Sequence, residues 1–421
     1  MDVDPQLHTL REAASSGDPD AVARLASSLV SGGQVEEGFT LYGQAADAGH
    51  PQARVESARM QLHGVGCAAD VQAAIAQFMR GESEGNVVCS YHLALVAVAG
   101  FALPFDESAE ARVLAAINAG YPPALRAAAL HFGRRGNDED QSRCLQLLER
   151  AAHSGDAVSA LLLSARVGAG EGCPPNAAFA AQLHARLAQH AVLPLPRVSV
   201  AAPRQPELQA GALYLREALL PVGCTVLSRE PRVGVVEQLL SADECRLLVA
   251  MGAPRLQRSR TLHPVTGAPL EIELRTSSDA SIDPIFEDLS LRLIQLRLAT
   301  AAGLPLVNAE PLIVLRYQPG EQYRPHRDYL PPAGPGLGPA GAGNRARTIC
   351  AYLNTVGGGG RTTFPLLGVG VDPVPGHAVV FDNLDPHGAP DPSTLHAGEP
   401  VAAGEKWLAT LWIRQRRFRD F

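Results

Sequence analysis

The stretch "YRPHRDYL" (residues 323–330) decides how the second half of this chain is interpreted. It places His326 and Asp328 two residues apart, in a segment with strand-like flanks. Residues two apart on a strand point to the same face, so both side chains could reach one metal ion. A His-x-Asp pair alone is common by chance and is more typical of ordinary surface polar groups. The rest of the chain has to decide between these two interpretations.

The bulk composition indicates a globular protein with reduced thiols. The chain has 421 residues, enough for two or three domains, with 46% hydrophobic and 19% charged residues. Its net charge of −7 argues against a general nucleic-acid or anionic-membrane binder, so neither partner is expected. The sequence shows neither a secretory signal nor an apolar run of about 18 residues. The seven scattered cysteines include no CxxC pair, which favours a cytoplasmic location.

The first half of the chain is built from repeats of about 35 residues. Each repeat carries a glycine, followed four residues later by a small side chain; the glycines are Gly17, Gly49, Gly85, Gly120 and Gly155. A helix that ends at glycine, followed by a closely packed second helix, explains this pattern. Stretches such as "LHGVGCAADVQAAIAQF" (residues 62–78) resemble tetratricopeptide-like repeats of the Sel-one-like kind. We therefore expect an all-α solenoid over residues 1–190, which serves as a partner-binding groove or only as a scaffold.

A change of pattern marks the second half. Residues 191–212, "AVLPLPRVSVAAPRQPELQAGA", are rich in proline and alanine and indicate a linker, which we place at 191–215. A helix with a Ser241–Glu244 capping box follows, and then a second helix with Asp283 as N-cap and Pro284 as its first residue. Its expected apolar face comprises Ile285, Leu289, Leu293 and Leu296.

Short strand candidates dominate after residue 310: "LIVLRYQ", "RTICAYLN", "TTFPLL", "HAVVFDN" and "KWLATLWIRQ". Strands that follow a pair of helices predict an α+β domain over residues 216–421, an antiparallel double-sheet barrel or jelly roll braced by helices.

Two histidines and one carboxylate can hold a non-haem Fe(II) ion and leave coordination positions open. His326 and Asp328 would supply two of these ligands, and the third could be His377, His387 or His396. We favour His396 because Lys406 follows it ten residues later. A dicarboxylate co-substrate bound to the iron needs a buried cation at its far end.

Residues 216–421 resemble the prolyl 4-hydroxylase family of Fe(II)- and 2-oxoglutarate-dependent dioxygenases, a double-stranded β-helix fold. The matching pieces occur in the family's order: "RTSSDASI", "LRYQPGEQYRPHRD", "NRARTICAYLN", "GGRTTFP", "GHAVVF" and "DPSTLHAGEPVAAGEKW". The resemblance implies Fe(II), 2-oxoglutarate and O2 as reactants, with L-ascorbate as the reductant that rescues oxidised iron. It also implies His326, Asp328 and His396 as iron ligands, and these residues with Lys406 as the catalytic set.

The same resemblance implies the remaining roles. Lys406 would pair with the 5-carboxylate of 2-oxoglutarate, and Tyr317 and Thr362 would hydrogen-bond it. Arg345 would be placed toward a polypeptide substrate. Trp407 and Trp412 are interpreted as core-packing residues.

Two features depart from the family's pattern. Arg361 stands where the family usually has glutamate, which reverses a charge near the mouth of the site. The loop "LPPAGPGLGPAGAGN" (residues 330–344) follows the metal pair and is either a lid or a tolerated insertion.

Three classes of function remain open at this stage. The first is a hydroxylase of a protein or peptide side chain, with proline favoured, whose substrate is recruited by the repeat groove. The second is an oxygenase of a small molecule whose repeats serve assembly. The third is a non-catalytic interaction protein. The oligomeric state cannot be inferred from the sequence.

Overall fold

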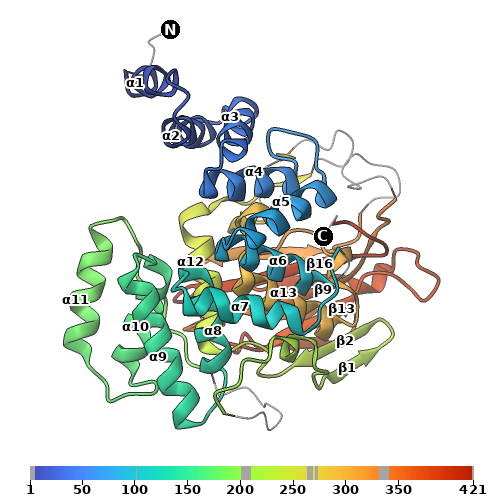
Figure 1. The fold of residues 1–421 in the computed structure, drawn as a ribbon. Helices are drawn as coiled ribbons and strands as arrows, with labels where there is room; N and C mark the ends of the chain where they lie inside the picture. The colour runs from blue at the N-terminus through green and yellow to red at the C-terminus, as the bar shows by residue number, and fades with distance from the viewer. Residues whose placement is uncertain are drawn as a thin grey trace. The chain divides into compact units, whose positions relative to one another are not determined.

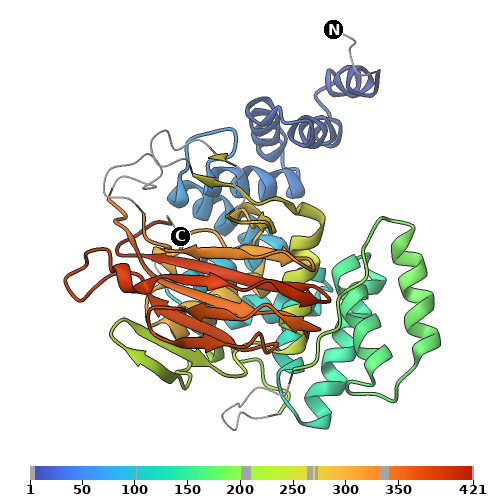
Figure 2. The same ribbon diagram turned by 180° about the vertical axis from the view of Figure 1, so that it is seen from behind.

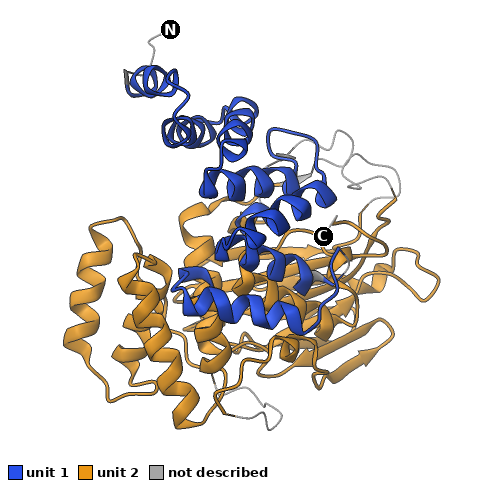
Figure 3. Cartoon of the chain, in the orientation of Figure 1, with its two compact units in different colours: residues 1–124, 284–286, 421 blue, residues 125–283, 287–420 orange. Residues whose placement is uncertain are grey.

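The protein is described by a computed structural model that covers residues 5–100, 102–200, 210–262, 269–270, 274–330 and 341–419. The chain forms two compact units (Figure 3). Unit 1 comprises the chain up to residue 124 together with 284–286, and unit 2 comprises residues 125–283 and 287–420. Of the predicted loop 330–344, residues 331–340 lie outside the described residues, and so do residues 201–209 of the predicted linker.

Unit 1 is a series of paired helices, drawn in blue to cyan in Figure 1. The helices are α1 (Pro5–Ala14), α2 (Pro19–Ser31), α3 (Val35–Asp47), α4 (Pro51–His63), α5 (Val71–Ser83), α6 (Val87–Ala99), α7 (Glu107–Asn118) and α8 (Pro122–Gly133), the last of which continues into unit 2. Each helix from α1 to α6 packs against the next one in the chain. The predicted helix-pair repeats are therefore present.

The repeat glycines end the first helix of each pair. All five adopt a left-handed backbone with φ between 74° and 93°, and an added Cβ atom would meet nothing within 4 Å. Glycine is thus required by the backbone conformation and not by lack of space. The small residue four positions later is at most 3% exposed in every repeat: Ala21, Ala53, Cys89, Ala124 and Ser159. Both parts of the repeat signature are confirmed.

Unit 2 contains the last repeat helices together with the whole strand-rich region. Its helices are α9 (Asp138–His153), α10 (Ala157–Ala169), α11 (Ala177–Ala188), α12 (Ala242–Gly252) and α13 (Leu289–Ala302). Arg166 of α10 pairs with Asp243 of α12, and Arg246 of α12 pairs with Glu171 at 2.6 Å. The compact units therefore divide near residue 124, whereas the sequence changes character at 191–215. None of the helices in the described part of the chain is long and apolar enough to cross a membrane.

Two antiparallel sheets form the core of the strand-rich region, and Figure 2 shows the larger one in front. The major sheet contains, in spatial order, β1 (Thr225–Arg229), β2 (Arg232–Val236), β13 (Ala378–Asp382), β9 (Arg345–Tyr352), β16 (Lys406–Arg414), β7 (Ile313–Tyr317), β6 (Ser278–Ser281) and β3 (Gln257–Arg258). The minor sheet contains β12 (Val369–Val371), β11 (Thr362–Phe364), β14 (His396–Gly398) and β8 (Tyr323–His326). Two further pairs are β10 (Gly358–Gly359) with β15 (Val401–Ala403), and β4 (Thr261–Leu262) with β5 (Pro269–Leu270).

Apolar side chains fill the space between the two sheets. Tyr352, Val379 and Phe381 of the major sheet pack with Phe364 and Val371 of the minor sheet, and all are buried. The opposite face of the major sheet packs against α12 and α13. The predicted double-sheet domain with bracing helices is confirmed, as are all five predicted strands.

The second bracing helix differs from its prediction. Residues Pro284–Phe286 form a short 3-10 turn, and α13 begins only at Leu289. Its N-cap is Asp288, whose carboxylate accepts a hydrogen bond from the Leu291 amide at 2.9 Å, so the expected Asp283 cap is wrong. The helix α13 is buried on nearly all sides, so it does not have the single apolar face that a surface helix would have.

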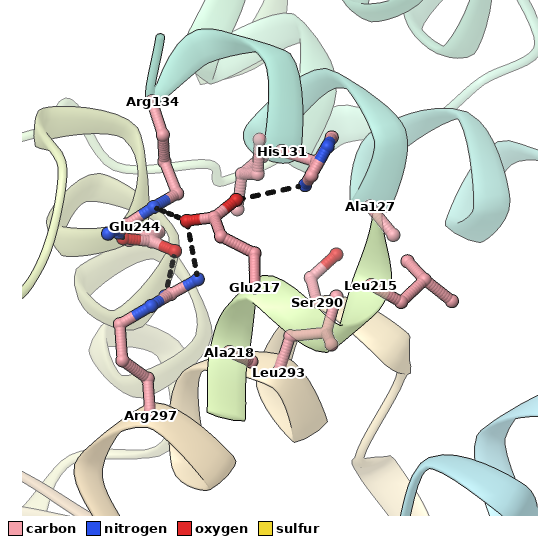
Figure 4. Close-up of a pocket in the computed structure, with 11 residues that line it drawn as sticks. Ala127, His131, Arg134, Leu215, Glu217, Ala218, Glu244, Ser290, Leu293 and Arg297 are labelled. Atoms are coloured by element: carbon pink, nitrogen blue, oxygen red, sulfur yellow. Dashed lines mark hydrogen bonds and ion pairs between the residues drawn. The ribbon is translucent and has the colours of Figure 1, made fainter. Parts of the chain in front are cut away.

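Buried ion pairs join α8 to the strand-rich region (Figure 4). Arg134, just after α8, binds Glu217 at 3.0 Å and also pairs with Glu244 of α12. Arg297 of α13 binds Glu244 at 2.5 Å, and His131 lies 3.2 Å from Glu217. Burial would raise the pKa of Glu217, but hydrogen bonding to His131 and the charges of Arg134 and Arg297 lower it well below its usual range.

Candidate metal centre

The two predicted histidine ligands are direct partners across the minor sheet. His326 ends β8 and His396 begins β14, and the two residues pair in the antiparallel register. Asp328 lies two residues past the end of β8 and is 6% exposed. Its Oδ1 lies 3.6 Å from His326 Nε2, and its Oδ2 lies 3.7 Å from His396 Nε2. One ligand atom from each residue lies within 4.8 Å of the other two.

Both imidazole rings are oriented by backbone carbonyl groups. His326 Nδ1 lies 2.9 Å from the carbonyl oxygen of Arg324, and His396 Nδ1 lies 3.0 Å from that of Thr394. A proton on each Nδ1 satisfies these contacts and leaves the lone pair of each Nε2 directed at the centre of the cluster. The ring of Tyr323 stacks on His326 with centroids 3.3 Å apart.

Asp328 is held by two hydrogen-bond donors on the major sheet. Thr348 Oγ1 donates to Oδ2 at 2.8 Å, and Trp412 Nε1 donates to the same oxygen at 3.0 Å. Thr348 in turn accepts a hydrogen bond from Asn383 at 2.9 Å. This chain of contacts fixes the carboxylate and leaves Oδ1 for a ligand role.

The charge state of the cluster suits a divalent cation. Burial lowers the pKa of His396 to about 4, helped by the neighbouring His326. Burial alone would raise the pKa of Asp328, but the two histidines lower it well below its usual range. A neutral imidazole beside an ionised carboxylate is the donor set that a divalent transition metal needs. The residues present therefore fit Fe(II).

The predicted co-substrate residues lie in the same pocket as the metal cluster. Tyr317 and Lys406 are direct partners across β7 and β16, and Thr362 comes from β11 of the facing sheet. All three line the pocket together with His326, Asp328 and His396. Thr362 accepts a hydrogen bond from the Tyr352 hydroxyl at 2.9 Å. The two sheets thus bring six predicted residues together.

Lys406 is a buried cation that forms no ion pair with any described acidic side chain. It is 2% exposed, and its ammonium group donates to the Gly360 carbonyl oxygen at 2.6 Å. Burial lowers its pKa to about 8. A carboxylate placed beside it would reverse that effect and gain a charge-assisted hydrogen bond.

Arg345 lies at the edge of the site and already has an acidic partner. Its guanidinium group binds Glu310 at 2.7 and 2.8 Å and stacks over the Trp412 ring at 3.6 Å. His377 and His387, the other ligand candidates, are not part of the three-residue cluster found among the described residues. Arg361, which stands where the family usually has glutamate, forms an exposed ion pair with Asp372 at 2.7 Å.

The interpretation of Trp412 as only a core residue is wrong, because its indole N–H holds Asp328. Lys406, Leu408, Thr410 and Trp412 all line the pocket, whereas Trp407 does not. This alternation is the period of two that a strand imposes. It is visible in the sequence and distinguishes the two tryptophans. Thr348 and Tyr323 were also missed, and their contacts depend on pairing between distant strands.

Comparisons with known proteins agree with this geometry. Residues 312–414 match the 2OG-Fe(II) oxygenase superfamily. Prolyl 4-hydroxylase 1 of Arabidopsis thaliana is 35% identical over 205 residues, which cover 45% of this chain and 71% of the relative. The chain belongs to the prolyl 4-hydroxylase family of 2OG-Fe(II) oxygenases. The mouse prolyl 4-hydroxylase subunit alpha-1 is 36% identical over 188 residues, covering 44% of this prolyl 4-hydroxylase-like chain and 35% of the relative.

Solved structures are similar to each half of this prolyl 4-hydroxylase family member. A viral collagen prolyl hydroxylase from Paramecium Bursaria Chlorella virus-1 is 29% identical, with a TM-score of 0.34, and the match covers 43% of this chain and 95% of the other. A Sel1 repeat protein from Oxalobacter formigenes is 23% identical, with a TM-score of 0.35, and the match covers 41% of this chain and 73% of the other.

Proposed function

We propose that this oxygenase hydroxylates a protein or peptide side chain, with proline favoured, in a reaction that consumes 2-oxoglutarate and O2. One observation carries the proposal: a His-Asp-His cluster and a buried lysine, which has no acidic partner among the described residues, share one pocket between the two sheets. The curated relatives, which are named as prolyl 4-hydroxylases, favour proline as the target.

The residues divide the work as follows. His326, Asp328 and His396 would hold Fe(II), which when bound supplies the oxidising chemistry that places a hydroxyl group on an unactivated carbon. Lys406 would bind the far carboxylate of 2-oxoglutarate, with Tyr317 and Thr362 hydrogen-bonding to it.

The surroundings of the pocket support these roles. Thr348 and Trp412 donate hydrogen bonds to Asp328 and would hold its carboxylate in place. Apolar side chains pack around the pocket between the sheets, and this low-polarity surrounding strengthens the contacts of the buried Lys406. L-Ascorbate would act from outside as the reductant that restores oxidised iron.

A polypeptide substrate is proposed for two further reasons. Arg345, which the family resemblance assigns to a polypeptide substrate, lies beside the metal cluster, where its Nη1 donates to the Asp328 carbonyl oxygen at 3.4 Å. The helical repeats offer extended surfaces that suit polypeptides better than metabolites. A cytoplasmic location is part of the proposal, and the seven free thiols support it.

The direct test measures succinate formation by the purified full-length protein with Fe(II), ascorbate and 2-oxoglutarate, with and without proline-containing peptides. We expect slow uncoupled succinate formation that rises when a peptide is accepted, with one oxygen atom added to the peptide by mass spectrometry. Free proline or another small molecule hydroxylated as well as any peptide would favour the small-molecule oxygenase. No succinate under any condition would favour the interaction protein.

Lys406→Ala should raise the apparent Michaelis constant for 2-oxoglutarate by more than a hundredfold while Fe(II) still binds. The substitution removes the cation that faces a buried carboxylate, an effect of about 3 kcal/mol or more. The Michaelis constant is measured by succinate formation, and iron binding is measured separately by equilibrium dialysis.

A pH profile of 2-oxoglutarate affinity distinguishes this role from a structural one. The pKa of Lys406 is lowered to about 8, so its ammonium form is lost as the pH rises through that value. Affinity of the wild-type protein should therefore fall above about pH 8, and Lys406→Ala should lack this dependence. An unchanged Michaelis constant in the variant would show that Lys406 does not bind the co-substrate.

A further inference from the structure

The segment that carries Asp328 lies beyond the last hydrogen-bonded residue of its strand. β8 ends at His326, and residues 327–330 form no backbone–backbone hydrogen bond with any other described residue. Side chains hold this segment instead. Just before Asp328, Arg327 Nε donates to the Pro392 carbonyl oxygen at 2.8 Å. The backbone position of this metal ligand therefore depends on contacts other than strand pairing.

On the other side of Asp328, the Asn344 side chain binds both polar backbone groups of Leu330. Its Nδ2 donates to the Leu330 carbonyl oxygen at 2.9 Å, and its Oδ1 accepts from the Leu330 amide at 2.7 Å. A residue in a neighbouring antiparallel strand offers its partner the same combination of one donor and one acceptor. The Asn344 carboxamide thus takes the place of a paired strand at this point. Leu330 and Asn344 are also the two ends of the predicted loop 330–344, so their pairing joins the ends of that loop.

Asn344 is itself fixed by its neighbours in β9 and after β16. Its Oδ1 accepts a second hydrogen bond, from the Arg345 amide at 2.8 Å. The oxygen therefore meets two N–H donors while the nitrogen meets a carbonyl group, which allows only one orientation of the carboxamide. The Asn344 amide donates to Gln415 Oε1 at 2.8 Å, and its carbonyl oxygen accepts from the Gln415 amide at 2.9 Å. One side chain thus ties Leu330 to the major sheet.

The same two strands of the major sheet also hold the Asp328 carboxylate. Thr348 of β9 and Trp412 of β16 donate to its Oδ2 at 2.8 and 3.0 Å. These donors orient the carboxylate, whereas Asn344 restrains the backbone that carries it. A metal site works only when its ligands are held within about 0.5 Å of the productive geometry. Freedom of the backbone at residues 328–330 would therefore disturb the site even with Thr348 and Trp412 in place.

We propose that Asn344 is a positioning residue for the iron site. By pairing with Leu330, it places Asp328 where its carboxylate can share one metal ion with His326 and His396. This inference rests on the proposed function, because it requires the cluster to bind Fe(II). Asn344 does not itself line the pocket and acts only through the segment that it holds.

Anaerobic equilibrium dialysis of the full-length protein with Fe(II), without 2-oxoglutarate, tests the proposal. Asn344→Ala removes the side-chain hydrogen bonds to Leu330 and Arg345. It should weaken Fe(II) binding at least tenfold, since loss of contacts that support a metal ligand costs roughly 10–100-fold in affinity. Asn344→Asp keeps both acceptor contacts and loses only the donor to Leu330. Its affinity should therefore lie between those of the wild type and Asn344→Ala.

Asn137→Ala is the matched control. Asn137 caps α9, where its Oδ1 accepts from the Asp140 amide at 2.9 Å and its Nδ2 donates to Asp140 Oδ2 at 2.7 Å. The substitution removes similar side-chain hydrogen bonds at a helix end that takes no part in the metal cluster. It should lower the thermal unfolding midpoint but leave Fe(II) affinity as in the wild type. Thermal unfolding without metal shows that each variant is folded before dialysis.

Equal Fe(II) affinity in the wild type and Asn344→Ala would overturn the proposal and leave the proposed function standing. The same loss of affinity in Asn137→Ala would also overturn it, because general destabilisation would then explain the effect. A wild-type protein that binds no Fe(II) would refute the proposed function together with this inference. Should Asn344→Ala fail to fold, Asn344→Asp decides, and wild-type affinity in that variant would contradict the positioning role.

Discussion

His326→Ala, Asp328→Ala and His396→Ala should each reduce 2-oxoglutarate turnover to the uncatalysed background. Each substitution removes one of three ligands from a cluster whose atoms lie within 4.8 Å of one another. Two remaining ligands hold a divalent ion weakly and in an undefined geometry. Succinate formation measures the loss of turnover, and equilibrium dialysis with Fe(II) under anaerobic conditions measures the loss of metal.

His387→Ala is the control for this series. His387 was a ligand candidate from sequence, but in the structure it lies in an exposed turn outside the cluster. Its replacement should leave both iron binding and succinate formation close to wild type. Loss of iron in His387→Ala together with normal iron binding in His396→Ala would show that the third ligand is misassigned.

Arg134→Met should destabilise unit 2 by about 3–5 kcal/mol, the cost of removing one partner from a buried ion-pair network. Arg134 lies between Glu217 and Glu244, and both carboxylates are less than 7% exposed. Methionine fills much of the same space, so the loss reflects charge more than packing. A domain is stable by only about 5–15 kcal/mol, so the fall in the denaturation midpoint should be large.

The pH dependence of that loss identifies its cause. The pKa values of Glu217 and Glu244 are lowered in the folded protein, so their contribution is full at neutral pH and falls as the pH decreases. The difference between Arg134→Met and wild type should therefore shrink in acid. Arg143→Met removes an exposed pair with Glu139, 3.0 Å apart, and should cost less than about 1 kcal/mol. Equal effects of the two substitutions would contradict the buried-network explanation.

Local patterns in the sequence predicted most of the elements. The repeat glycines, the Ser241–Glu244 capping box and the five strands after residue 310 each depend on a few neighbouring residues, and the structure contains all of them. The start of α13 was misplaced because Asp283 and Asp288 are both good N-caps. In the structure the chain forms a separate 3-10 turn at Pro284–Phe286, and α13 starts after Asp288.

The site was predictable where one strand carries the signal. Two short spacings in the sequence predicted the main site residues: His326 and Asp328 are two residues apart, and His396 and Lys406 are ten residues apart. The contacts of Asp328 with Thr348 and Trp412 bring together three segments that are distant in the chain. The extent of unit 2 could not be predicted either, because the acidic partners of Arg134 and Arg166 are distant in the sequence.

The pairing of His326 with His396 has a consequence for how the edge of the minor sheet behaves. The two residues face each other across β8 and β14, and the register shifts between His396 and Gly398. A shift of one residue would turn His396 to the other face of its strand. An ion bound by both side chains would fix the register between β8 and β14. Without iron, the two strands would lose the ion that joins His326 to His396, so loss of the metal would weaken their pairing as well as silence the enzyme.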